Sequence, residues 1–306
     1  MNSRLILLSL FTALCLPAMG QIAQPLGNHY TPGIEGLEGG SLPPPGFYTR
    51  NYFYSYQADR VTNGQGAREP IGFQTMVFAV APRLLYITPY KILGADYGCS
   101  IVLPFVYDHT KISAFDLDQS RVGLADIYVE PLDLSWHLPQ ADFLVTAGVY
   151  TPTGTFSTSN ESSLGSGFWT QMTTAGATFY ADKERAWHLS LLDRLEFSSR
   201  QEQTGLTPGN GELVEWGLGH SVDFTKEAGG ILDIGPTGYV TWQYTPTTSD
   251  NDSLNHHEEQ AVAFGGEASW FMPAEGWIFS LRGEHDFITR YHPQGDTMTL
   301  TITKRF

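Results

Sequence analysis

The chain has 306 residues and a formal net charge of -15 at pH 7. A chain this acidic repels the phosphate backbone, so we expect no nucleic acid among its partners. Mean hydropathy is -0.17, and beyond the first twenty residues no stretch is apolar for long enough to cross a bilayer as a helix, which argues against a helical membrane protein. Aromatic residues at 13% and 32 glycines favour strands and turns.

Residues 1–20 are predicted to be a signal peptide. Arg4 precedes an apolar run over residues 5–16, which Pro17 ends, and small residues around Gly20 suit cleavage after that position. The run is too short to span a bilayer as a helix. We therefore expect a secreted chain that begins at residue 21.

Residues 21–46 form a segment rich in glycine and proline before the first predicted strand. Ile34, Leu37 and Leu42 are scattered through it without a period. Two interpretations stay open: a periplasmic N-terminal segment, or a plug that inserts into the interior of the barrel predicted below.

Residues 47–306 are predicted to form about twelve strands, each bounded by Gly, Pro, Asn or Asp clusters. They are expected at 47–59, 73–88, 95–108, 124–138, 142–150, 168–180, 187–198, 213–225, 237–245, 262–272, 277–288 and 297–306. An even count allows an antiparallel sheet to close with both of its ends on one side. The predicted fold class is all-β, an antiparallel transmembrane β-barrel of the outer-membrane type.

The predicted connections alternate in length. Long polar ones are expected at 109–123, 151–167, 199–212 and 246–261, and short ones at 139–141, 181–186 and 273–276. Outer-membrane barrels have long extracellular loops and short periplasmic turns. This pattern predicts the outer membrane of a Gram-negative bacterium, with both barrel termini in the periplasm.

Several strands separate an apolar face from a charged one. In 277–288, for example, Trp277, Phe279 and Leu281 share the apolar face. Arg or Lys on the lipid face would cost about 2 to 4 kcal/mol at the midplane, so the charged face must point into the lumen. The lumen-lining candidates are Arg194, Glu196, Glu215, Asp223, Glu267, Arg282, Glu284 and Asp286. They either pair across a rigid, filled interior or line a passage and screen permeants by charge.

One strand changes phase. Apolar residues occupy Ile127 and Val129 but Leu132 and Leu134 after Pro131, so one residue has been absorbed. Because a one-residue shift exchanges the two faces and proline has no N–H to donate, we predict a β-bulge at Glu130 or Pro131. Such a bulge bends the wall and can open a side exit.

The last ten residues alternate apolar side chains with a wet face made mostly of threonine, and end on Phe306. This ending resembles the C-terminal signal by which Gram-negative bacteria insert outer-membrane barrels. We therefore expect two partners: the outer-membrane assembly machinery and outer-membrane lipid.

No motif of a soluble enzyme class stands out, and we predict no catalytic residue, cofactor or metal. The stretch at Gly165-Ser166-Gly167 lacks the Gly-x-Ser-x-Gly spacing of a hydrolase nucleophile. The tract 256–259 (HHEE) lies in a polar loop without a scaffold, and the calcium-like start at Asp250 has Leu254 where a ligand oxygen belongs.

The turn motifs resemble those of a bacterial family of outer-membrane barrels, the meta-pathway (MetA-pathway) phenol-degradation family. The resemblance rests on 42–47 (LPPPGF), on 123–126 (GLAD) running to Pro131-Leu132, and on 152–154 (PTG). It implies a barrel that is often encoded near aromatic-compound catabolism and admits hydrophobic substrates.

From the residues and this resemblance we expect an outer-membrane channel for passive uptake of small hydrophobic or aromatic compounds. One alternative is a barrel-embedded lipid hydrolase, because histidines lie on strands at His137, His188, His220 and His285 and one could meet a serine at about 3 Å. Another is a closed structural barrel.

Overall fold

The structure of the protein is a computed structural model that describes residues 28–156, 163–249 and 258–306. The predicted signal peptide lies outside the described residues, as do Asp250, His256 and His257. In the described ranges, no helix is long and apolar enough to cross a membrane.

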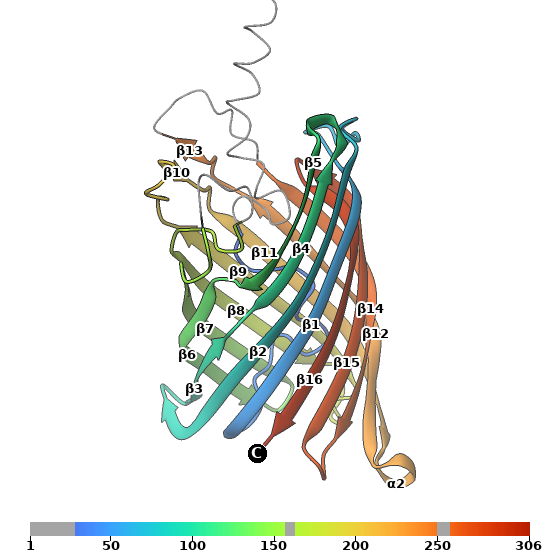
Figure 1. Ribbon diagram of the computed structural model, residues 1–306. Helices are drawn as coiled ribbons and strands as arrows, with labels where there is room; N and C mark the ends of the chain where they lie inside the picture. Colours follow the sequence, from blue (N-terminus) through green and yellow to red (C-terminus); the bar gives the residue numbers. More distant parts are fainter. Residues whose placement is uncertain (1–27, 157–162, 250–257) are drawn as a thin grey trace, which may run out of the picture.

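Long strands make up the wall of the molecule (Figure 1). Their bounds are β1 Gly46–Val61, β2 Phe73–Ile92, β3 Ala95–Val102, β6 Ile127–Leu138, β7 Ala141–Thr151, β8 Thr170–Tyr180, β9 Trp187–Ser198, β11 Gly211–Phe224, β12 Gly230–Gln243, β14 Gln260–Met272, β15 Trp277–Arg290 and β16 Pro293–Arg305. The remaining elements are β4 Phe105–Ile112, η2 Ser113–Phe115, β5 Leu117–Leu124, β10 Leu206–Thr207, α2 Thr225–Ala228 and β13 Thr248–Ser249.

The twelve wall strands form a closed antiparallel barrel. They follow one another around the wall as β1-β16-β15-β14-β12-β11-β9-β8-β7-β6-β3-β2, and β2 pairs again with β1. Closure leaves each wall strand with a neighbour on both sides, which is what a sheet in lipid requires. The fold class predicted from the sequence is confirmed.

The two ends of the barrel differ, as Figure 1 shows. Short connections join β2 to β3, β6 to β7, β8 to β9, β11 to β12 through α2, and β14 to β15, and this short-turn end also holds the C-terminus. Most of the longer connections lie at the opposite, long-loop end, where β10 pairs with β13. The last connection is shorter than predicted, because β15 and β16 are separated by Tyr291 and His292 alone.

The two faces of the wall separate as the alternation predicted. On β15, Phe279, Leu281 and Phe287 point outward and are 39%, 48% and 51% exposed. Arg282 and Glu284 point inward and are buried. The interior is therefore polar and the outside apolar.

The region 109–123 departs from the prediction, because it is not a loop. It holds the end of β4, the η2 turn and β5, which pairs with β4. Neither face of β5 is apolar, since Asp118, Ser120 and Val122 share one face and Val122 is 80% exposed. A period-two search for an apolar face therefore misses it.

The β4–β5 hairpin continues the sheet beyond β3, because β4 pairs with the first part of β2, from Phe73↔Ile112 to Val80↔Phe105. Between β3 and β4 the chain passes Leu103 and Pro104, next to Pro82 of β2, and prolines remove ladder donors. Between β5 and β6 it passes Ala125 and Asp126. In the described ranges β5 pairs with β4 on one edge and with no strand on the other.

A second irregularity lies lower in the same part of the wall. The register between β6 and β7 shifts between Val129 and Leu132, and that between β3 and β6 shifts between Gly98 and Ser100. The first shift falls at Glu130 and Pro131, where the phase slip places the bulge.

The C-terminus closes the seam of the barrel. Phe306 N–H donates to the carbonyl oxygen of Phe47 at 2.9 Å, and the two rings lie 5.8 Å apart. Inward threonines of β16, among them Thr299 and Thr301, are buried, so the wet face predicted for the last strand faces the interior.

Candidate functional site

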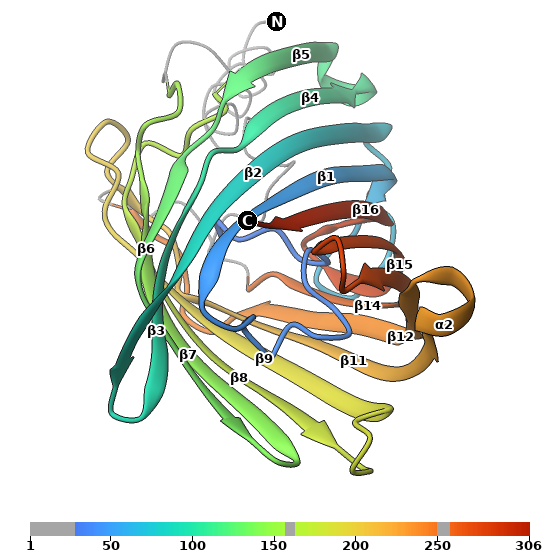
Figure 2. The same ribbon diagram turned by 90° about the horizontal axis from the view of Figure 1, so that it is seen from below.

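Residues 28–45, here called the lumen segment, run through the inside of the barrel (Figure 2). At one end, Asn28 Nδ2 donates to Thr241 Oγ1 of β12 at 2.7 Å. At the other, Ser41 Oγ donates to Asp142 Oδ2, near the start of β7, at 3.0 Å. The segment therefore passes from the long-loop half of the interior to the short-turn end, where β1 begins.

Inward carboxylates hold the first part of this segment by its backbone. Glu196 accepts from the N–H groups of His29 at 2.6 Å and Tyr30 at 2.8 Å. The segment forms no helix or strand, so its buried N–H groups need acceptors from elsewhere. Two further inward glutamates of the wall accept from its N–H groups, and Ser190 Oγ accepts from Gly40 N–H at 2.7 Å.

Glu215 is the central anchor. Its Oε1 lies 3.1 Å from three successive backbone nitrogens, those of Gly33, Ile34 and Glu35. Its Oε2 accepts from the Tyr30 hydroxyl at 2.9 Å. One carboxylate thus fixes a whole turn of the segment.

The next anchor combines a carboxylate with close packing. Glu267 Oε2 accepts from Leu37 N–H at 3.0 Å, and Arg282 Nε donates to the same oxygen at 3.1 Å. A Cβ at Gly217 of β11 would lie 2.8 Å from the Cα of Leu37. Glycine at this position lets the segment's backbone lie directly on the wall.

Three other charged residues predicted to line the lumen are buried inside the barrel: Arg194, Glu284 and Asp286. Arg194 donates to Thr174 Oγ1 at 3.0 Å and lies 4.0 Å from the centre of the Tyr30 ring. Glu284 accepts from Thr237 Oγ1 at 2.7 Å, and Asp286 accepts from the Tyr239 hydroxyl at 2.6 Å.

Asp223 is not among the side chains that meet the lumen segment. It is exposed at the end of β11 and accepts from Thr225 N–H at 2.8 Å, at the start of α2. The prediction that Asp223 lines the lumen is therefore wrong, because this end of β11 lies beside α2 and the side chain is exposed there.

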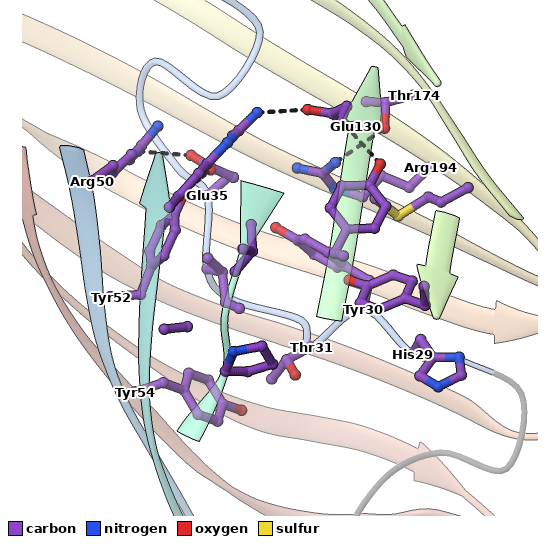
Figure 3. A pocket seen from close by; sticks show the side chains of 18 of the residues that line it. His29, Tyr30, Thr31, Glu35, Arg50, Tyr52, Tyr54, Glu130, Thr174 and Arg194 are labelled. Carbon is purple, nitrogen blue, oxygen red and sulfur yellow. Dashed lines mark hydrogen bonds and ion pairs between the residues drawn. The ribbon is translucent and has the colours of Figure 1, made fainter. Parts of the chain in front are cut away.

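A cavity of about 140 Å³, partly open to solvent, lies between the lumen segment and the wall from β1 to β9 (Figure 3). Its apolar lining comes from the lumen segment, from β2, β3, β4, β7, β8 and β9, and from the connections between them. On the side of β2 and β4 this lining includes Ala79, Ala81, Val102, Pro104, Val106 and Leu164. Tyrosines and three arginines, Arg50, Arg83 and Arg194, line the rest together with carboxylates. The cavity is therefore amphipathic.

Glu130, in the bulge, is the fixed polar point of the cavity wall. Its Oε1 accepts from Arg83 at 2.6 Å and Ser100 at 3.2 Å, and its Oε2 from Tyr128 at 2.7 Å and Thr146 at 2.8 Å. Four strands, β2, β3, β6 and β7, thereby meet at one carboxylate.

Two of the three cavity arginines, Arg50 and Arg83, were missed by the sequence reasoning. Arg50 lies on β1 at the same inward face as Tyr52 and Tyr54, and Arg83 follows Pro82 on β2. The alternation of aromatic with polar residues in β1 could have indicated an inward Arg50. Nothing local predicts that both arginines meet one cavity.

The comparisons with known proteins follow this geometry. The family model described as "Putative MetA-pathway of phenol degradation" matches residues 58–302. The chain belongs to this family. A search of curated proteins finds no match.

Solved structures support the same architecture for this MetA-pathway family member. It is similar to the COG4313 outer-membrane channel from Pseudomonas putida F1, with a TM-score of 0.75, 17% identity, and coverage of 91% of this chain and 100% of that one. The β domain of the Bordetella autotransporter BrkA gives a TM-score of 0.52 at 12% identity, covering 85% and 99%. At these identities the likeness concerns the fold, that of Gram-negative outer-membrane barrels.

Two of the turn motifs that carry the family resemblance meet at Asp126. Its Oδ1 accepts from Gly154 N–H at 2.8 Å and its Oδ2 from Ser166 N–H at 2.7 Å. His29 Nε2 of the lumen segment lies 2.9 Å from the same Oδ2. Asp126 therefore joins the start of β6, the β7–β8 connection and the lumen segment.

One strand histidine of this family member meets a serine and an aspartate. His137 Nε2 lies 3.3 Å from Ser135 Oγ, and its Nδ1 lies 3.2 Å from Asp142 Oδ1. Ser135 is only 1% exposed, so its hydroxyl is shielded from an ester. Across the residues that the structure describes, no three His, Cys, Asp or Glu side chains gather as metal ligands would.

Proposed function

We propose that this protein is a passive channel of the Gram-negative outer membrane for small hydrophobic compounds, aromatic ones included. The family description, which names phenol degradation, and the channel fold of the Pseudomonas putida structure support this assignment. In this proposal the short-turn end and both barrel termini face the periplasm, as the loop lengths favour. The chain has no catalytic role.

One observation supports the proposal most strongly: the axis of the barrel is occupied by the lumen segment and its charged anchors, whereas an apolar cavity lies beside it. Along the axis, the lumen segment is tied to Glu196, Glu215 and Glu267. An aqueous solute would meet this segment and its charges. Beside it, the cavity of about 140 Å³ offers apolar surface and is about the size of a cavity that holds benzene.

The wall next to this cavity is weakly paired. Pro104 and Val106 line the cavity near β5, which pairs with β4 on one edge and, among the described residues, with no strand on the other. Where the structure describes it, the β7–β8 connection lies beside β5 without a ladder to it: Arg121 Nη1 donates to Ser163 O at 3.0 Å, and Leu164 would lie 2.9 Å from a Cβ at Gly123. A loop cover opens at lower cost than a hydrogen-bonded ladder, so we propose that the permeant leaves sideways here.

The bulge at Glu130 and Pro131 extends this weak region toward the short-turn end. Replacing Pro131 by Val supplies the missing N–H and favours a continuous ladder. We expect the variant barrel to fold and the uptake of an apolar solute to fall. The comparison variant carries both Glu284→Gln and Asp286→Asn. It removes two charges from the barrel interior, far from the bulge, and is called the charge-neutralised variant.

The experiment measures uptake of 4-phenyl-1-butanol and of choline by cells that lack the native gene and express each variant. P131V should slow the aromatic alcohol and spare choline, whereas the charge-neutralised variant should change choline more than the alcohol. Equal loss of both solutes in both variants would indicate one central aqueous pore, and the lateral route would have to be abandoned.

A further inference from the structure

Two arginines face each other across neighbouring strands at the edge of the cavity. Arg50 of β1 is the direct register partner of Arg83 of β2, and both line the cavity. Like charges directly opposite on a sheet are destabilising unless anions neutralise them. Two carboxylates are therefore needed here to neutralise the two guanidinium groups.

The two arginines are neutralised by carboxylates from different parts of the chain. Arg83 pairs at 2.6 Å with Glu130, which three further donors hold within the wall. Arg50 pairs at 2.8 Å with Glu35, which belongs to the lumen segment (Figure 3). The wall thus supplies the counter-charge of Arg83 but not that of Arg50.

Glu35 is bound as a guest carboxylate would be. Its Oε2 meets Arg50 Nη2 and its Oε1 accepts from the Tyr52 hydroxyl at 2.7 Å, and the side chain is buried. Burial alone would raise the pKa of the Glu35 carboxyl, but the guanidinium groups of Arg50, Arg194 and Arg83 lower it below its usual value. Glu35 is therefore present as an anion.

The guanidinium of Arg50 is only partly used by Glu35. Among the described residues its Nε is buried without a hydrogen-bond partner while Glu35 is in place, although 31% of the whole side chain is exposed. A carboxylate that engages Nε and Nη2 together would form the stronger, two-point pairing typical of arginine. Ala79, Ala81 and Val102 line the cavity close by and provide an apolar surface for the rest of such a molecule.

We infer that Arg50 and Tyr52 form a head-group site for a monocarboxylate with an apolar body, and that Glu35 occupies this site as an internal substitute. A permeant carboxylate displaces Glu35 from Arg50, and its apolar part lies along the cavity. This inference rests on the proposed function and narrows it to a class of cargo. Neutral compounds then enter the same cavity without this contact.

The test compares two probes that share a skeleton, 4-phenylbutanoate and 4-phenyl-1-butanol. Their dissociation constants are measured by calorimetry on the full chain in lipid nanodiscs, with empty discs subtracted. Glu35→Gln removes the competing carboxylate and should tighten 4-phenylbutanoate about tenfold, the size of one charge-assisted hydrogen bond. Arg50→Gln should lower the affinity ratio of carboxylate to alcohol about tenfold, and Arg50→Lys should retain part of it. Arg60→Gln, on the same strand but outside the cavity lining, is the control for charge.

Unchanged carboxylate affinity in E35Q would overturn the inference, as would an unchanged ratio in R50Q. If R50Q fails to give a heat-modifiable folded barrel, E35Q and R50K still decide the question. Uptake of 4-phenyl-1-butanol by cells reports the proposed function separately. Uptake of the alcohol without carboxylate preference would refute this inference alone, whereas no uptake of the alcohol would refute the channel itself.

Discussion

Glu215 holds the lumen segment most firmly, so its removal should release the segment. In Glu215→Ala, three backbone N–H groups and the Tyr30 hydroxyl lose their acceptor. At about 1 kcal/mol for each of the three backbone bonds, the bound position loses about 3 kcal/mol relative to a released one. That shifts the equilibrium between the two positions about 150-fold.

The assay is single-channel conductance in planar bilayers. Once the segment leaves the axis, ions can pass through the charged interior, so the fraction of time spent in a high-conductance state should rise about 100-fold or more, following the shift above. Glu212→Ala is the matched control, because Glu212 lies on the same strand but faces away from the interior.

Heat-modifiable migration of both variants verifies that the barrel is folded. A folded E215A barrel that conducts like the wild type would contradict this reasoning. It would mean that the packing of the segment against glycines such as Gly217 holds it without the carboxylate.

Two further predictions concern assembly and orientation. Deleting Phe306, which bonds to Phe47 across the seam, should lower the amount of folded barrel in the outer membrane, as judged by heat-modifiable protein; unchanged insertion would reduce its role to ordinary lipid-facing packing. A cysteine at Gln65 of the long-loop end should react with an impermeant maleimide on intact cells and one at Glu275 of the short-turn end should not, in a Cys99→Ser background; the opposite labelling would reverse the proposed orientation.

The barrel itself could be predicted because its physics is local. Alternation along a strand directly reports which side chains meet lipid, so the inward positions of Glu215 and Arg282 follow from their neighbours. The bulge likewise shows in the sequence as a change of phase at Pro131. Such signals need no knowledge of distant residues.

The contents of the barrel could not be predicted, because they depend on pairs far apart in the chain. The three N–H groups at Gly33, Ile34 and Glu35 bind a carboxylate about 180 residues away, and glycine-rich sequence alone does not indicate a partner. β5 escaped prediction for a different reason, since a strand without an apolar face leaves no period-two signal. The amphipathic cavity arises where these unpredicted elements meet the wall.

The central claim is that the protein lets small hydrophobic molecules cross the outer membrane passively. The most direct test is the initial uptake rate of 4-phenyl-1-butanol in cells with and without the protein, measured through a native outer membrane because plain phospholipid passes such solutes unaided. The account predicts a rate that rises in proportion to the amount of folded barrel, does not saturate at low concentration and is insensitive to an uncoupler. An uptake rate that is the same in both kinds of cell would contradict it.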